Sequence, residues 1–347
     1  MASLSLKQKL RLIKSDTGGD SMNIMPEKGE VVPKSNISSE KKMAGVKRIK
    51  NTFLREKQLW LICIPIILWV LLFAYYPMYG LIMAFIDYEP GRAILDSDWV
   101  GFKHFIEFFQ SPDFWMVLRN TLVISGLGIV FGFPAPILLA LLLHELKYTR
   151  FKKFVQTVSY LPHFMSWVVV ASIVFVTLGN EGVFNQFLMS IGIIDRPVSF
   201  LGEGKYFWGV ITGADIWKGI GWSSIIYLSA IAGVDSQLYE AGKMDGLGRF
   251  GLIWHVIIPG IRPTIVILMI LGISGILNAG FEQQLLIGNV QTREYWEVFD
   301  TYSYRYGIQL GNYSYATAVG LFKSIIGLIL LVGANKFCKK FFDTSVY

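Results

Sequence analysis

The chain has 347 residues, of which 53% are hydrophobic and only 16% are charged. Soluble domains carry about a quarter charged residues, so this composition excludes an ordinary soluble domain and indicates a protein surrounded by lipid. The formal net charge is +7, and residues 1–57 hold 13 Lys/Arg against 6 Asp/Glu, which we interpret as a cytosolic anchor beside a membrane span and not as a nucleic-acid-binding region.

The first 57 residues are polar, rich in Lys, Ser and Gly, and have no sustained apolar face. Such a composition predicts a disordered tail. It also lacks the apolar core of a cleavable signal peptide. We therefore expect a basic cytoplasmic tail at residues 1–57 and a second, short tail at residues 341–347.

Six apolar runs follow between residues 58 and 340, each close to the ~20 residues needed to cross a bilayer. Backbone groups in lipid must bond internally, so these runs are expected to be helices. The predicted spans are residues 58–88, 117–143, 154–178, 206–233, 256–279 and 314–335. The sequence therefore predicts an all-α polytopic membrane protein with six transmembrane helices.

Proline positions predict irregularities in two of these spans. Pro65 and Pro77 are expected to kink the first span, and Pro134 and Pro136 to disturb the middle of the second.

The distribution of basic residues predicts the orientation of the chain. The 1–57 tail, the 144–153 and 234–255 loops and the end from Lys336 hold 22 Lys/Arg, whereas the three opposite loops hold 6. By the positive-inside rule, both termini and the 234–255 loop are expected in the cytoplasm.

The segment 234–258 has the composition of a short helix on the cytoplasmic face. Asp235 or Ser236 can cap its start, and glycine at Gly246 and Gly248 can end it. An apolar stripe recurs at helical spacing, formed by Val234, Leu238, Ala241 and Met244. Physics alone leaves open whether this is an interfacial connector or an element that passes motion from a cytosolic partner to the bundle.

The residues Glu240-Ala241-Gly242, then Gly246, then Ile258-Pro259 resemble the EAA loop of bacterial ATP-binding-cassette importer permeases. Gly242 replaces an Ala of that pattern, and Ile258 stands where the pattern has Leu. The loss of helix propensity at Gly242 is about 1 kcal/mol. The resemblance implies a type I importer permease fold and a coupling helix that enters a cleft on an ATPase subunit. The coupling residues that it implies are Glu240, Ala241, Gly242, Asp245, Gly246 and Pro259.

Further segments, among them DIWKGIGWSSIIYL and YSYATAVGLFKSIIGLILL, are similar to the polysaccharide and multi-sugar branch of these permeases. The resemblance covers most of residues 58–340. It implies that the chain lies in a bacterial cytoplasmic membrane. It also implies three kinds of partner: a second related permease, a pair of ATPase subunits that carry ATP and Mg²⁺, and an extracellular solute-binding lipoprotein. No cofactor is expected on this chain.

Asp215 lies well inside the predicted fourth span, where polar groups are costly and usually functional. Gly219 and Trp222 follow at helical spacing on nearly the same face. A carboxylate accepts sugar hydroxyls, an indole stacks on a pyranose ring, and a glycine leaves room for a ligand. The alternative is a structural ion pair between Asp215 and Lys218.

The resemblance adds positions in the neighbouring spans. It implies that Ser274 and Asn278 of the fifth span and His163 and Trp167 of the third, each pair four apart, line one cavity with the fourth span. His163 is more often a core histidine than a ligand. Glu282, near the end of the fifth span, belongs either to this sugar site or to the outer loop.

The outer loop 280–313 is rich in aromatic residues. These residues are interpreted either as an interfacial belt or, from the resemblance, as a docking surface for the substrate-binding protein.

No phosphate-binding G-x-x-x-x-G-K-[ST] motif and no H-E-x-x-H motif occurs, so neither ATP binding nor enzyme activity is expected of this chain. Cys63 and Cys338 have no metal-site or disulfide spacing and are expected to be inert core thiols. Two other functions stay open: a proton-coupled sugar carrier that uses Asp215 and Glu282 as a relay, and a membrane scaffold without transport.

Overall fold

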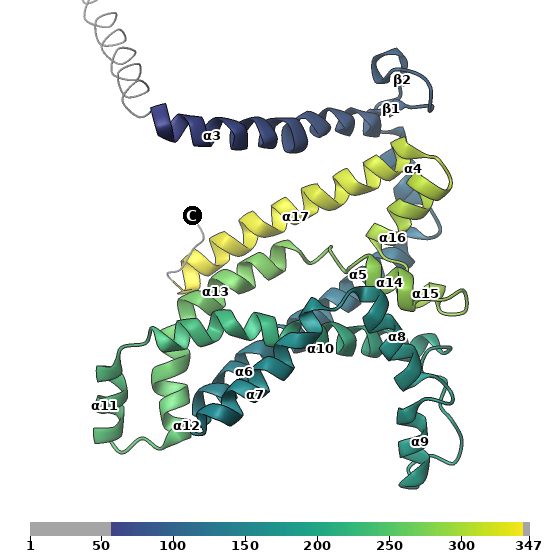
Figure 1. Ribbon diagram of the computed structural model, residues 1–347. Helices are drawn as coiled ribbons and strands as arrows, with labels where there is room; N and C mark the ends of the chain where they lie inside the picture. The colour runs from purple at the N-terminus through teal and green to yellow at the C-terminus, as the bar shows by residue number, and fades with distance from the viewer. Residues whose placement is uncertain (1–56, 343–347) are drawn as a thin grey trace, which may run out of the picture. The chain divides into compact units, whose positions relative to one another are not determined.

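The computed structural model describes residues 57–342, which form almost entirely helical structure (Figure 1). The predicted tails, apart from Lys57 and residues 341–342, lie outside the described residues. The chain divides into two units, one up to Tyr76 and one from Pro77 onward.

The first unit contributes helix α3 (Lys57–Val70) and the π turn η1 (Leu71–Tyr75). Pro65 lies inside α3 without ending it. All residues from Gln58 to Tyr76 are exposed in this unit. Cys63 is therefore exposed, so the prediction of a core thiol is wrong there, whereas Cys338 is buried as expected.

The second unit begins at Pro77, the second residue of the 3-10 helix η2 (Tyr76–Phe85), so the backbone changes geometry next to this proline. Strand β1 (Ile86–Asp87) then pairs antiparallel with β2 (Asp98–Trp99), and the short helix η3 (Ile94–Asp96) lies in the connection between them. Helix α4 (Lys103–Gln110) follows.

The predicted second span is a long helix with an irregular middle, as its prolines indicate. Helix α5 (Phe114–Leu127) passes through the π turn η4 (Gly128–Gly132) into α6 (Pro134–Glu145). In this turn the Phe133 N–H donates to the Gly128 carbonyl oxygen, five residues earlier, at 2.8 Å. Pro134 has no N–H to continue a regular ladder, which explains why the irregularity falls here.

The predicted third span is not one helix. Helix α7 (Thr149–Tyr160) and the 3-10 turn η5 (Leu161–Phe164) end before α8 (Trp167–Leu178), which is followed by α9 (Val183–Ser190). Ser166 takes an extended conformation and caps α8 by accepting a hydrogen bond from the Val169 N–H at 3.4 Å. The single helix predicted over 154–178 is therefore wrong.

Helix α10 (Gly204–Ala232) corresponds to the predicted fourth span and packs against α6, α7 and α13. Its 29 residues correspond to about 43 Å, enough to cross a bilayer. Five helical segments between residues 57 and 342 are long and apolar enough to span a membrane, and α10 is not among them. Asp215, Lys218 and several glycines make it less apolar, so the predicted count of six apolar spans is not confirmed. The five are Gln58–Phe85, Phe114–Glu145, Trp167–Ser190, Arg249–Ser274 and Tyr313–Lys340.

After α10 the chain forms α11 (Ser236–Met244), then α12 (Arg249–Leu252), the π turn η6 (Ile253–Ile257) and α13 (Ile258–Ser274). The fifth span was predicted to reach residue 279, but α13 ends at Ser274. The residues beyond it form short elements and lead to the last long helix, α17 (Tyr313–Phe342). These elements are α14 (Glu282–Ile287), α15 (Arg293–Trp296), α16 (Phe299–Tyr304) and η7 (Arg305–Gln309).

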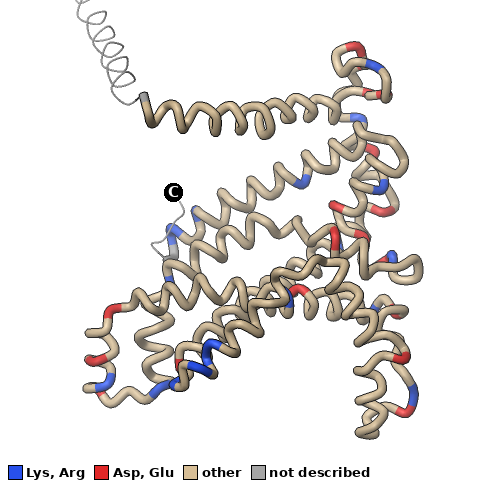
Figure 2. The backbone as a smooth tube through the Cα atoms, in the orientation of Figure 1, with Lys and Arg blue, Asp and Glu red and all other residues tan. Residues whose placement is uncertain are grey.

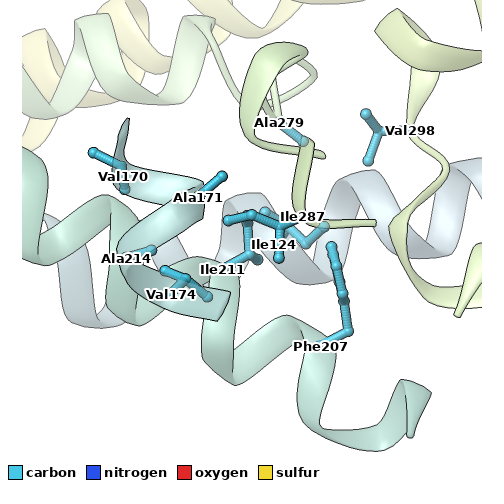
Figure 3. Packing of buried hydrophobic residues seen from close by; sticks show 10 residues of the cluster. All are labelled: Ile124, Val170, Ala171, Val174, Phe207, Ile211, Ala214, Ala279, Ile287 and Val298. Atoms are coloured by element: carbon cyan, nitrogen blue, oxygen red, sulfur yellow. The ribbon is translucent and has the colours of Figure 1, made fainter. Parts of the chain in front are cut away.

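Buried apolar side chains form separate clusters along the second unit. In the cluster of Figure 3, Ile124 of α5, Ile211 of α10 and Ile287 of α14 lie together. Another cluster joins α4, α5, α16 and α17 and contains Phe299 and Tyr302 with no exposed surface. These two aromatics of the outer loop are core residues, so neither a lipid belt nor a docking surface describes them. Charged residues gather at helix ends and in connections (Figure 2).

Candidate functional site

A cavity of about 500 Å³ lies inside the helical bundle of the second unit. One wall is the irregular α5–η4–α6 helix, a second is α10, and a third runs from α13 to Gln283. Glycines at four wall positions leave backbone uncovered, so a ligand can approach it closely. These glycines are Gly128, Gly132, Gly272 and Gly275.

Asp215 projects into this cavity from α10, as the sequence predicts for a ligand-binding carboxylate. It accepts a hydrogen bond from Gln283 Nε2 at 3.4 Å, which joins α10 to α14. Gly280 has a φ of +89°, and a Cβ there would overlap the Gln283 amide. Gly280 thus provides the turn and the space that let Gln283 reach Asp215.

Gly219 lies on the same face of α10 and lines a slot of about 160 Å³ that also reaches Asp215. The slot and the larger cavity share six residues, so the two spaces adjoin. The shared residues are Ile124, Gly128, Gly132, Pro136, Asp215 and Ser223. Asp215 and Gly219 therefore line one space, as residues four apart on a helix can.

Lys218 does not form the ion pair with Asp215 that was the alternative interpretation. Its Nζ donates to the carbonyl oxygens of His163 at 2.7 Å and Met165 at 2.8 Å. These carbonyls lie at the interruption between α7 and α8. Since unpaired backbone groups are costly in an apolar setting, Lys218 holds this interruption together.

The aromatic residues expected at the site lie elsewhere. Trp222 stacks on His163 with ring centroids 4.6 Å apart and planes 2° apart, and neither residue lines the cavity. Trp167 is the first residue of α8, and Lys218 Nζ lies 5.7 Å from its ring centroid. The argument that His163 and Trp167 share one helix face is wrong because the helix is interrupted between them.

Of the three residues expected near the end of the fifth span, not all line the cavity. Asn278 lines the cavity, but Ser274 is the last residue of α13, so the two do not share a helix face. Both line a second space of about 330 Å³ beside Lys323. Glu282 is exposed at the start of α14, and its neighbour Gln283 takes the position in the cavity.

The coupling segment predicted from the EAA pattern forms helix α11, which begins and ends as its sequence indicates. Asp235 Oδ1 accepts a hydrogen bond from the Gln237 N–H at 2.9 Å. Gly246 has a φ of +80° and its N–H donates to Lys243, while the Leu247 N–H donates to Gly242. This is the paired bonding of a Schellman motif, which requires a residue that tolerates positive φ.

The Gly242 departure from the EAA pattern has a packing role in this chain. Gly242 is buried, and a Cβ at this position would lie 2.9 Å from Leu252 and 3.2 Å from Leu247. The glycine therefore lets α11 lie close to α12. Most of the remaining surface of α11 is exposed, including Leu238 at 52% and Met244 at 87%.

An ion cluster outside the cavity was missed by sequence reasoning. Glu297, only 1% exposed, accepts hydrogen bonds from Arg293 at 2.9 Å and from Arg305 at 2.6 Å. Asp113, beside the start of α5, pairs with the same two arginines at 3.2 and 2.9 Å. Burial of Arg305 opposes its charge, but the bonds to Glu297 and Asp113 outweigh this and raise its pKa. The cluster fixes the segment 293–305 to α5.

Asn120 strengthens the same connection. It is fully buried and donates to the carbonyl oxygens of Glu294 at 2.9 Å and Glu297 at 3.0 Å. The segment 293–305 is thus held by α5 through both charge and backbone contacts.

Membrane-length apolar helices around a mainly apolar cavity with a few polar groups are typical of an integral membrane protein of the permease class. The chain belongs to the family of binding-protein-dependent transport system inner membrane components, whose sequence model matches residues 128–340. It is a transport subunit of such a system.

Individual relatives extend the comparison over most of the chain. Protein LplB of Bacillus subtilis (strain 168) is 47% identical over 294 residues, which cover 84% of this chain and 92% of LplB. The polygalacturonan/rhamnogalacturonan transport system permease YteP of the same organism is 47% identical over 302 residues, covering 87% and 94%.

A solved structure is also similar. It is a bacterial alginate ABC transporter in complex with an alginate pentasaccharide-bound periplasmic protein. Its matching chain superimposes with a TM-score of 0.79 and 39% identity, covering 86% of this chain and 100% of that chain.

Proposed function

We propose that this chain is the permease subunit of an ATP-driven importer that moves a carbohydrate across the bacterial cytoplasmic membrane by alternating access. The cavity at Asp215 is the observation that carries this proposal. Its carboxylate, amide and hydroxyl groups among apolar walls suit a polyhydroxylated ligand. The carbohydrates in the names of YteP and the alginate transporter agree with it.

Helix α11 is the proposed contact with an ATPase subunit. Leu238 and Met244 are exposed on this helix, and Glu240, the proposed polar anchor, lies on the same side as Met244, four residues away. An exposed apolar patch beside a charge is the composition of an interaction surface. The remaining proposed coupling residues are Ala241, Gly242, Asp245, Gly246 and Pro259, which shape this helix and its connection to α13.

The proposed cycle uses subunits other than this chain for energy and delivery. ATP and Mg²⁺ bind to the ATPase pair, whose closure moves α11 and turns the bundle toward the outside. A solute-binding protein then delivers the saccharide to a path formed by this chain and a second, related permease. Hydrolysis returns the cavity to the cytoplasmic side.

The proposed orientation places both termini in the cytoplasm. Lys and Arg gather around the start of α7 and at α12 (Figure 2). Arg249 of α12 also lies 4.0 Å from Glu145 at the end of α6. The basic ends of these helices and α11 would therefore face the same side, in accord with the positive-inside rule.

Reconstituted vesicles test the proposal. The chain is purified with its ATPase, its permease partner and its binding protein, and uptake of a labelled oligosaccharide is measured with ATP or a non-hydrolysable analogue. We expect uptake only with ATP and the ATPase, and no loss when a protonophore is added at constant ATP.

Two results would contradict it. Uptake driven by a proton gradient without ATP would favour the proton-coupled carrier. Absence of uptake under every condition, with an intact and ATP-hydrolysing complex, would favour a scaffold.

A further inference from the structure

A strongly basic segment follows the end of α6. Residues 146–180 hold four Lys/Arg and no Asp/Glu, and the four cations fall within seven consecutive residues around the start of α7 (Figure 2). The membrane-length segment Phe114–Glu145 ends just before them, so they lie at one end of an apolar span. The four cations are Lys147, Arg150, Lys152 and Lys153.

Two of these cations have no counter-charge in the described part of the chain. Arg150 and Lys153, three positions apart on α7, are both exposed. Neither side chain forms an ion pair or a hydrogen bond with any of residues 57–342. Lys205, in the first turn of α10, is also exposed but is paired with Glu203. The outward side of α7 therefore presents two neighbouring cations that are available to an anionic ligand.

An exposed apolar stripe continues from these cations along α7 to the start of η5. Its four side chains are 52–64% exposed and follow one another at spacings of three, four and three residues, which places them on one side of the helix. The chain then runs toward the apolar segment Trp167–Ser190, so the stripe extends from the charged end toward the membrane interior. The stripe consists of Phe151, Phe154, Val158 and Leu161.

A ligand with an anionic head and an apolar tail matches this surface at both ends. We propose that α7 binds an anionic phospholipid, whose phosphate lies against Arg150 and Lys153 and whose acyl chain lies along the stripe. Basic residues beside a membrane span attract anionic lipids, and the exposed ring of Tyr148 before α7 suits the headgroup layer. A zwitterionic lipid has no net charge to offset the two cations. Lipid binding at this surface is independent of the transported substrate.

The test uses phosphatidylglycerol with a photoreactive diazirine on one acyl chain, and phosphatidylcholine with the same labelled chain. The complete transport complex that contains this chain is placed in phosphatidylcholine nanodiscs with a trace of either probe and is irradiated. Mass spectrometry of the digested protein then quantifies the label on residues 151–161. We expect phosphatidylglycerol to label this segment roughly tenfold more than phosphatidylcholine. Added salt should reduce the preference, because exposed charges are screened.

Charge variants connect the preference to the two cations. Arg150→Gln and Lys153→Gln should each lower the labelling by phosphatidylglycerol about fivefold, the factor for one cation at an anionic membrane surface. The double variant should be labelled alike by both probes, whereas Arg150→Lys keeps the charge and should keep most of the preference. Lys205→Gln is the matched control and should change nothing. Melting temperatures in phosphatidylcholine should stay the same, because neither cation has a partner in the described chain.

Three results would overturn the lipid site. The first is equal labelling of residues 151–161 by the two probes, and the second is a preference that persists in the double variant. The third is the absence of label on this segment from either probe. A chemical cross-link from Lys153 to another subunit of the complex would, in that third case, assign the surface to a protein partner.

Discussion

Lys218 Nζ on α10 lies 2.7 Å from the carbonyl oxygen of His163, on the segment that interrupts α7 and α8. Leaving these carbonyls without a donor costs roughly 2 kcal/mol. We therefore expect Lys218→Met to lower the melting temperature of the purified protein by several degrees. Lys205→Met, in the exposed first turn of the same helix, is the control and should have little effect. Equal stability of the two variants would refute the bridging role.

Glu297 lies buried between Arg293 and Arg305, and its removal should destabilise the segment 293–305. Breaking a fully buried pair costs about 3–5 kcal/mol. Because the arginines are 42% and 25% exposed, we expect a smaller loss for Glu297→Gln, about 2 kcal/mol. The matched control is Glu294→Gln, three residues earlier in α15, since Glu294 is 66% exposed and 3.8 Å from Arg119. Thermal unfolding of both variants checks the difference, and a similar shift in each would count against a buried cluster.

Gly280 combines a φ of +89° with the space that Gln283 occupies. Gly280→Ala should lose about 1–2 kcal/mol through backbone strain and also displace Gln283 from Asp215. Gly311→Ala has a φ of +73° and open space at its Cβ, so it reproduces the strain without the steric overlap. Uptake assays should show a several-fold loss for Gly280→Ala alone. The same loss in both variants would mean that strain, and not the Gln283 contact, is responsible.

Glu240 is exposed on α11, where the ATPase contact is proposed. Glu240→Lys reverses a charge without disturbing the cap at Asp235 or the turn at Gly246. We expect the complex to assemble in the membrane while saccharide uptake per ATP hydrolysed falls at least tenfold. Glu89→Lys, on an exposed loop near β1, provides the control. Normal uptake in Glu240→Lys would remove α11 from the coupling proposal.

Much of the fold follows from local sequence rules. The apolar runs form helices, Pro134 coincides with an irregular helix, and Asp235 and Gly246 bound α11 as capping chemistry predicts. Each of these features depends on residues a few positions apart, so the sequence alone was sufficient to place them.

The errors concern residues whose partners are distant in the chain. The interruption before α8 is bridged by Lys218, which is more than 50 positions away, so no local pattern indicates it. Ser274 and Asn278 were placed on one face by assuming that the helix continues, but α13 ends at Ser274. Gln283 occupies the cavity in place of Glu282 because the register of α14 depends on the turn at Gly280.

The π turn η4 has a geometric consequence for the helix that contains it. It holds one more residue than a regular turn, so it rotates α6 relative to α5 by about 100°. Asn120, before the turn, bonds to the segment 293–305, and Leu141, beyond the turn, packs with Tyr227 of α10. If one residue of this turn were deleted, α6 would rotate back relative to α5. One of these two helices would then present the wrong side to its neighbours. The number of residues in this stretch is therefore constrained independently of their chemical identity.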